Sequence, residues 1–192
     1  MPDPNPAALE FLLTRRSRPA KTLIPPVPTA QELTPILTAA ARSPDHGKLE
    51  PWRLIVIQGA AFARLADLAE TRGRALKLDE EQIAKGRAQY DQGNLAVAVI
   101  FSPQDSPKIP LVEQRYSAGA VCLALLNAAL AAGWGANWLT GWPVHDADFL
   151  REGLEVTAPE EVAGLIHIGT ERMVPPERPR PDLDRITTWL SA

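Results

Sequence analysis

The feature that most constrains the fold is the stretch from Leu111 to Ala132, which predicts one long helix. Its second half is apolar on almost every side, and a helix of that kind cannot lie on a protein surface. The apolar stretch Ala118 to Ala132 is interrupted by Asn127 and is shorter than the roughly 20 residues that a membrane span needs. We therefore expect a central helix, part of which could be buried against a second copy of the chain.

The remaining elements indicate a mixed fold. The continuous apolar run Leu95–Phe101 predicts a strand that is covered on both faces. Residues 53–57 and Val162–Ile168 predict two more strands, and Thr29 with Glu32 predicts a capping box at the start of a helix. The helices are predicted over residues 7–16, 62–74, 79–90, 146–152 and 182–190 as well as after Thr29. Segment 79–90 has little apolar face, so we expect it to be peripheral or mobile. Three to five strands among six or more helices indicate an α+β domain rather than a βαβ repeat.

The composition is typical of one globular domain over residues 1–192. The formal net charge of -3 gives no general basic surface, so we expect no nucleic-acid partner. The single cysteine, Cys122, excludes an internal disulfide and any CxxC metal or redox pair, and a reduced, cytoplasmic setting fits this. The first residues lack a cationic stretch followed by an apolar core, so we expect no signal peptide and no membrane association.

Several common catalytic motifs are absent. The chain has no GxxxxGK phosphate loop, no GxGxxG that opens a helix after a strand, no HExxH and no GxSxG. Its three histidines, at 46, 145 and 167, are scattered and do not make a metal site. The sequence therefore lacks the motifs that a hydrolase or a zinc-site interpretation would require.

The first of two cationic clusters is the triplet Arg15-Arg16-Ser17 at a predicted helix end. Arginine binds phosphate bidentately, so two guanidinium groups and a hydroxyl suit a phosphate monoester. Cationic side chains near a helix C-terminus also complement the helix dipole, and a solvated helix end is the alternative interpretation.

The second cluster lies in the loop between the helix after Thr29 and the strand at 53–57, a place where scaffolds commonly display chemistry. Its polar members are Arg42, Asp45, His46 and Lys48. His46 could donate to a ligand oxygen, or it could simply bond a local carbonyl. We expect both cationic clusters to contact one anionic cofactor.

Aromatic and isolated polar residues are expected to serve mainly structural roles. Trp134, Trp138 and Trp142 are expected to pack in the core, with lining of a flat-ligand pocket as the alternative. Trp52 is expected to anchor the loop, and Arg53 to form a structural ion pair. The remaining expectations are a hydrogen-bonded core position for His167 and an inert, apolar position for Cys122.

Taken together, these segments resemble the nitroreductase family of FMN-dependent oxidoreductases, in particular its short, compact members. The resemblance covers nearly the whole chain. Its segments are RRS at 15–17, RSPDHGKLEPWRLIVI at 42–57, SAGAVCLALLNAALAAGWGANWLTG at 117–141, IHIGT at 166–170 and ERPRPDL at 177–183. The triplet alone is a weak signal, whereas the order and spacing of all five segments are specific.

The resemblance implies a central, mostly antiparallel sheet flanked by helices, assembled as an intertwined homodimer with two FMN sites at the interface. It implies that NADH or NADPH donates a hydride and that a small-molecule acceptor, such as a nitroaromatic compound or a quinone, is reduced with ping-pong kinetics. No side chain is required as a general base. The implied FMN contacts are Arg15, Arg16 and Ser17 in one subunit, Arg42, Asp45, His46 and Lys48 in the loop of the partner subunit, and Trp138, Leu139, Thr140, Arg178 and Arg180.

The chain departs from the family pattern at several positions. His46 and Lys48 stand where many members have serine or asparagine, and Pro19 stands where many have lysine or arginine. Leu139 replaces an arginine of some relatives. Because these changes alter the charge around the flavin, other flavin chemistry (dehalogenation or flavin cleavage) and a non-catalytic FMN-binding dimer remain the alternative functions.

Overall fold

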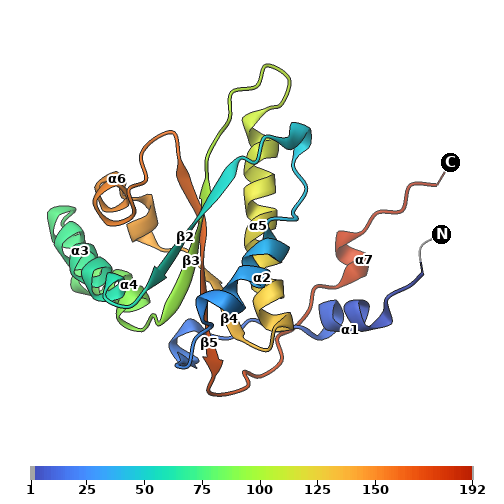
Figure 1. Cartoon of the computed structure of the whole chain (residues 1–192), viewed down its shortest axis with the longest axis horizontal. Helices are drawn as coiled ribbons and strands as arrows, with labels where there is room; N and C mark the ends of the chain where they lie inside the picture. Colours follow the sequence, from blue (N-terminus) through green and yellow to red (C-terminus); the bar gives the residue numbers. More distant parts are fainter. Residues whose placement is uncertain (1–2, 192) are drawn as a thin grey trace.

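The computed structural model describes residues 3–191, and its centre is an antiparallel sheet of five strands (Figure 1). The strands are β1 (Leu23–Ile24), β2 (Trp52–Gln58), β3 (Leu95–Phe101), β4 (Gly135–Leu139) and β5 (Glu161–Glu171). Their order is β1-β5-β3-β2, and β4 pairs with β5 off this path. Every pairing is antiparallel, so the expected α+β class and sheet type are confirmed.

Strand β3 is buried at all seven positions, as its unbroken apolar sequence predicts. Its side chains alternate between two core layers. Ala96, Ala98 and Ile100 belong to one layer. Leu95, Val97 and Val99 belong to the layer on the other face. The sheet therefore needs helices on both faces, and it has them.

One face is covered by α5 (Leu111–Ala131) and α2 (Ala30–Ala40). Helix α5 buries Val121, Cys122 and Leu125 completely, which confirms the central helix. Helix α2 begins with the predicted capping box, in which the Thr29 side chain accepts from the Glu32 backbone N–H and the Glu32 carboxylate accepts from the Thr29 backbone N–H.

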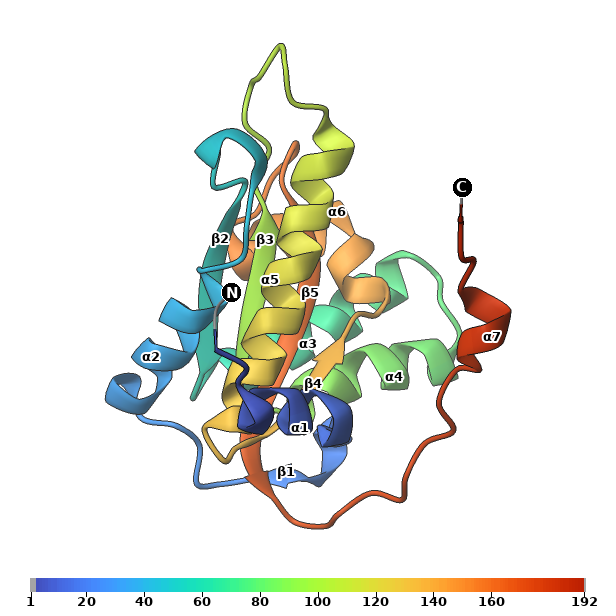
Figure 2. The same cartoon turned by 90° about the vertical axis from the view of Figure 1, so that its right-hand side faces the viewer.

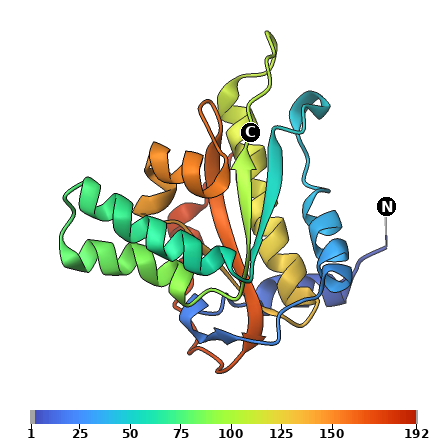
Figure 3. The same cartoon turned by 60° about the vertical axis from the view of Figure 1, so that its left-hand side comes forward.

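The other face is covered by α3 (Ala61–Ala75), by α6 (Ala147–Phe149) and by the π-helical turn Leu150–Leu154 (Figure 3). Helix α4 (Glu80–Asp91) packs along α3. It packs mainly on α3 and not on the sheet, so it lies at the periphery as predicted, and Ile83 and Tyr90 are the side chains that it buries there. The sequence signal is weak because only one narrow strip of α4 is apolar. The 3₁₀ turn Trp142–His145 adds Trp142, whose Nε1 donates to the Gln82 carbonyl at 2.9 Å.

The two ends of the chain pack little. Helix α1 (Pro6–Thr14) has no buried residue, and α7 (Leu183–Ile186) is much shorter than the helix predicted over 182–190. The tail beyond β5 runs away from the sheet (Figure 2). Large apolar side chains on these segments are exposed, namely Leu9, Leu12, Leu13, Leu183, Ile186, Trp189 and Leu190. Within residues 3–191, no helix is both long enough and apolar enough to cross a bilayer.

Candidate functional site

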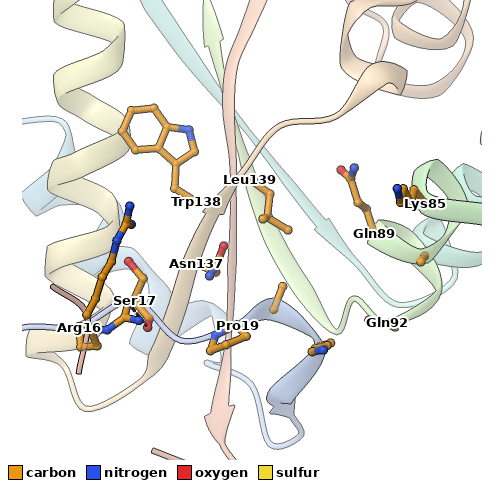
Figure 4. Close-up of a pocket in the computed structure, with 13 residues that line it drawn as sticks. Arg16, Ser17, Pro19, Lys85, Gln89, Gln92, Asn137, Trp138 and Leu139 are labelled. Atoms are coloured by element: carbon orange, nitrogen blue, oxygen red, sulfur yellow. Dashed lines mark hydrogen bonds between the residues drawn. The ribbon is translucent and has the colours of Figure 1, made fainter. Parts of the chain in front are cut away.

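A cavity of about 640 Å³ lies between the turn that follows α1, strand β4 and helix α4 (Figure 4). This volume is in the range of small-molecule and cofactor sites. Its lining residues are Arg16, Ser17, Pro19, Ala20, Lys21, Lys85, Ala88, Gln89, Gln92, Asn137, Trp138, Leu139 and Arg178. Segments far apart in sequence therefore meet at one concave surface.

The turn that carries the RRS triplet is fixed to β4 by hydrogen bonds. The Arg18 backbone N–H donates to the Ala136 carbonyl at 2.8 Å. The Asn137 side-chain amide donates to the Arg18 carbonyl at 2.7 Å. The Arg18 guanidinium is itself paired with Glu171. Arg18 thus anchors the turn, in which Arg16 and Ser17 line the cavity and Arg15 lies just outside its lining.

Arg15 and Arg16 are only partly paired. Arg15 Nη2 donates to Ser17 Oγ at 2.9 Å, and Arg16 Nη1 lies 3.4 Å from the Ser17 carbonyl oxygen. The Nε groups of both arginines are buried without a hydrogen-bond partner in residues 3–191. Burial, followed by the positive charges of Arg180, Arg16 and Arg18, lowers the pKa of Arg15. A phosphate group could accept hydrogen bonds from these buried guanidinium N–H groups, and its negative charge would offset their mutual repulsion.

The charge of the cavity has one sign. Its ionisable lining residues are Arg16, Lys21, Lys85 and Arg178, and this described lining contains no aspartate or glutamate. Lys85 Nζ is paired with Glu81 at 2.6 Å on the exposed side of α4. The field therefore favours an anionic ligand.

The cavity also has a flat apolar wall. The Trp138 indole lies over the backbone of Gly164, where an added Cβ would be 2.1 Å from Trp138 Nε1. Trp138 is 38% exposed and lines the cavity, so the core-packing expectation is wrong for this residue. Leu139 also lines the cavity but points to the other side of β4 (Figure 4). Trp134 and Trp142 do pack against the two core layers.

The second cationic cluster lies near the opposite end of α5 from the cavity (Figure 1). There His46 Nδ1 is 2.7 Å from the Glu113 carboxylate, and Asp45 accepts a hydrogen bond from the Glu50 backbone N–H at 2.8 Å. Gly47 has a φ of 75°, which favours glycine in this tight turn. Asp45 and His46 line a separate, open hollow on α5, whereas Arg42 and Lys48 line neither surface. Within one chain, the two cationic clusters are therefore not brought together.

Ser117 joins this loop to α5, and its removal should be measurable. Its hydroxyl accepts from Trp52 Nε1 at 3.1 Å and donates to the Pro44 carbonyl at 3.0 Å. We expect Ser117→Ala to lower the free energy of unfolding by about 1–2 kcal/mol, because two part-buried hydrogen bonds lose their shared partner. Urea denaturation measures this, and Ser191→Ala, at an exposed serine, serves as a control whose midpoint should stay close to that of the native chain.

The predicted site residues thus fall into three groups. The cavity lining includes Arg16, Ser17, Trp138, Leu139 and Arg178. Close to it but outside the lining are Arg15, Thr140 and Arg180, the last paired with Glu177 at 2.7 Å. The loop residues Arg42, Asp45, His46 and Lys48 lie elsewhere.

Sequence reasoning missed the contribution of α4 and of Asn137. Lys85, Gln89 and Gln92 recur at intervals of four and three, which places them on one face of a helix. That polar stripe was the available signal. Asn137 lies on a strand whose sequence was interpreted only as an aromatic segment.

Three other polar residues have structural surroundings. Arg53 forms the predicted ion pair, with Nε 2.7 Å from Glu160. Burial raises the pKa of the Cys122 thiol to about 12, in accord with an inert thiol. His167 is buried but its Nε2 has no hydrogen-bond partner in residues 3–191, so the expected hydrogen bond is missing there, and burial lowers its pKa to about 4. No group of histidine, cysteine, aspartate and glutamate side chains in the described chain could hold a metal ion.

Comparison with known proteins places the chain in a family. Residues 12–170 match the Nitroreductase family. The chain is 32% identical over 166 residues to YdjA of Escherichia coli strain K12, which is provisionally named an NAD(P)H nitroreductase; the match covers 86% of this chain and 89% of YdjA. The chain therefore belongs to the nitroreductase family, a family of oxidoreductase enzymes.

Solved structures agree on the fold. The nitroreductase-like family protein of Bacillus cereus superposes with a TM-score of 0.80 at 21% identity and covers 100% of both chains. A provisionally named nitroreductase of Desulfovibrio desulfuricans, crystallised in complex with FMN, superposes with a TM-score of 0.73 at 20% identity and covers 98% of this chain and 99% of its own.

Proposed function

We propose that the chain is an FMN-dependent oxidoreductase that takes a hydride from NADH or NADPH and reduces nitroaromatic compounds, quinones or similar small acceptors with ping-pong kinetics. The observation that carries the proposal is the pair of buried, unpartnered guanidinium N–H groups of Arg15 and Arg16 beside a cavity without lining carboxylates. A phosphate monoester satisfies both the charge and the missing hydrogen bonds. Family membership and the FMN bound to the Desulfovibrio desulfuricans protein support the same cofactor.

The residues of the cavity suit the parts of FMN. Arg15, Arg16 and Ser17 would hold the phosphate, and Leu139 would supply an apolar contact for the ring, with Trp138 on the other side of β4. FMN supplies the hydride-transfer chemistry, and the protein orients it and tunes its surroundings. Lys21 adds positive charge to the cavity, which favours the uptake of electrons by a bound ligand. A cytoplasmic setting, where the nicotinamide donors are available, forms part of this proposal.

We further propose that the functional unit is an intertwined homodimer, in which Arg42, Asp45, His46 and Lys48 of one subunit approach the cavity of the other. The separation of the two cationic clusters within one chain supports this arrangement. So does the apolar surface of the protomer, because Tyr116 and Leu123 on α5 are 71% and 47% exposed and α1 buries nothing. Apolar surface of this extent marks an interaction site.

One preparation tests the function. Purified protein reconstituted with FMN should retain flavin absorption after gel filtration and should elute as a dimer by light scattering at micromolar concentration. Anaerobic NADH or NADPH should bleach the flavin bands, and a nitroaromatic acceptor should restore them without nicotinamide present. Retained flavin that neither donor bleaches would identify a non-catalytic FMN-binding dimer. Bleaching without re-oxidation by nitroaromatics or quinones would point to other flavin chemistry.

A further inference from the structure

The indole of Trp142 lies in a slot between helices α3 and α4. Its Nε1 donates to the Gln82 carbonyl of α4 at 2.9 Å. A Cβ built on Gly86 of α4 would lie 2.2 Å from Trp142 Nε1. On α3, a Cβ built on Gly73 would lie 2.8 Å from Ile83 Cγ1 and 3.3 Å from Trp142 Cζ2. A side chain at Gly86 would therefore push the indole out of the slot.

Gly86 has no role in forming its own helix. It lies within α4, where glycine is less favourable than every residue except proline. Its presence is explained by the close approach of Trp142, which needs the space that a Cβ would fill. The slot is therefore a specific fit between the indole and α4.

The segment that carries Trp142 also joins the two walls of the cavity. Strand β4, one wall, ends at Leu139, and Gly141 and Trp142 follow it against α4. A Cβ built on Gly141 would lie 1.9 Å from Gln89 Nε2, and Gln89 belongs to the other wall. Because α4 packs mainly on α3 and not on the sheet, this segment is a direct link between α4 and β4.

The two ends of α4 are held differently. Near its C-terminal end, Tyr90 is 1% exposed and packs against Phe149, with the ring centroids 5.4 Å apart. In the first half of α4, Ile83 is buried and Trp142 fills the slot. Arg87 pairs with α3 only through partly exposed groups, which contribute little to stability. Without the indole, the first half of α4 would loosen while Tyr90 stayed in place as a pivot.

We propose that Trp142 is a positioning residue that holds the first half of α4 toward the end of β4 and thereby sets the width of the cavity. Lys85 and Ala88 line the cavity from this helix, so a movement of α4 away from β4 widens it. The consequence for acceptors rests on the proposed function: the native width admits small flat acceptors and disfavours larger ones. Selection of this kind depends on the size of the acceptor and not on its polar groups.

Gly86→Ala and Trp142→Leu test the position of α4 in the apoprotein. Hydrogen exchange followed by mass spectrometry reports the opening of each helix separately. In both variants, residues 82–88 should exchange about tenfold faster than in the native chain. Helix α3 should keep its native exchange, because Arg72 anchors it to Asp146 at 2.8 Å. Gly86→Ala is the sharper variant: alanine favours the helix itself, so faster exchange must come from the displaced indole.

Trp134→Leu is the matched control. It removes the same side chain from a position that packs against the core layer on the opposite face of the sheet. The control should leave the exchange of α4, measured relative to that of α3, at its native value.

Acceptor size is tested on the protein reconstituted with FMN, using 1,4-naphthoquinone and the larger 9,10-phenanthrenequinone. The ratio of kcat/KM for the larger quinone to that for the smaller one should rise about tenfold in Gly86→Ala and in Trp142→Leu. This ratio does not depend on the fraction of protein that holds FMN. Trp134→Leu should keep the native ratio.

Native or slower exchange of α4 in Gly86→Ala would overturn the role of Trp142, whatever the quinones show. Faster exchange with an unchanged ratio would overturn the control of acceptor size and support the positioning of α4. A native chain that binds FMN but reduces neither quinone would contradict the proposed function, and the exchange of the apoprotein would still decide the role of Trp142.

Discussion

Replacing Arg15 and Arg16 together with methionine should weaken FMN binding about a thousandfold. Hydrogen bonds from a charged donor contribute roughly 1.5–3 kcal/mol each, and about 1.4 kcal/mol corresponds to a tenfold change in affinity. Two lost contacts therefore amount to about three orders of magnitude. The apoprotein should not become less stable, because the Nε groups of both arginines are buried without partners in the described chain, and burial together with neighbouring cations lowers the pKa of Arg15.

The measurement is a titration of apoprotein with FMN, together with urea denaturation of both proteins. Arg74→Met with Arg151→Met is the control, since it removes the same charge from two exposed ion-paired sites away from the cavity. This control should bind FMN within about threefold of the native chain, because exposed charges at a distance are screened. Unchanged FMN affinity in the Arg15 and Arg16 variant would show that the phosphate is held elsewhere.

His167 should make the fold sensitive to acid. Burial lowers its pKa to about 4, whereas an unfolded histidine titrates near 6.5. The unfolded chain therefore takes up a proton that the folded chain rejects. Above about pH 6.5 the folded state bears no penalty from this residue, and stability is lost as the pH falls from about 6.5 to about 4. The loss amounts to roughly 3 kcal/mol, and it levels off at lower pH.

The test compares the native chain with His167→Leu in urea at pH 7 and at pH 4. The native chain should lose about 3 kcal/mol more than the variant over this interval, because leucine does not titrate. Carboxylates contribute equally to both proteins, so the difference isolates the histidine. His145→Gln, at an exposed histidine, should retain the native pH dependence. Parallel pH profiles for the native chain and His167→Leu would contradict the assignment.

Much of the fold could be predicted from the sequence because its strongest signals are local and unambiguous. The unbroken run Leu95–Phe101 indicates a strand with two covered faces, and Thr29 with Glu32 marks a helix start by its own hydrogen bonds. Ambiguity increases where one buried strip is narrow. Helix α4 buries only Ile83, Gly86 and Tyr90, and Gly86 is buried because Trp142, 56 positions later, packs against it.

The site could also be predicted only where its residues carry a clear local signal. Arg16, Ser17 and Arg178 could be chosen by charge and by family resemblance, since their chemistry is specific for anions. Gln89 and Asn137 carry no such signal, because an amide side chain is common on any surface. Their importance depends on which groups the fold leaves unpaired or joins across β4, and that depends on contacts between distant segments. The prediction that Trp138 packs in the core failed because its exposure depends on a contact with Gly164 of the neighbouring strand, which the local sequence does not reveal.

The position of β3 also bears on how the chain is made. Its seven apolar residues are paired on one edge by β2, which precedes it, and on the other by β5, which begins roughly sixty residues later. At about 5–20 residues per second, a ribosome exposes that edge for about 3–12 s before the pairing partner emerges. A nascent chain that stops short of β5 exposes the unpaired backbone N–H and C=O groups of β3, which can pair with other chains. The second edge of β3 is therefore paired only after β5 has been made, so the centre of the sheet closes late relative to its own synthesis.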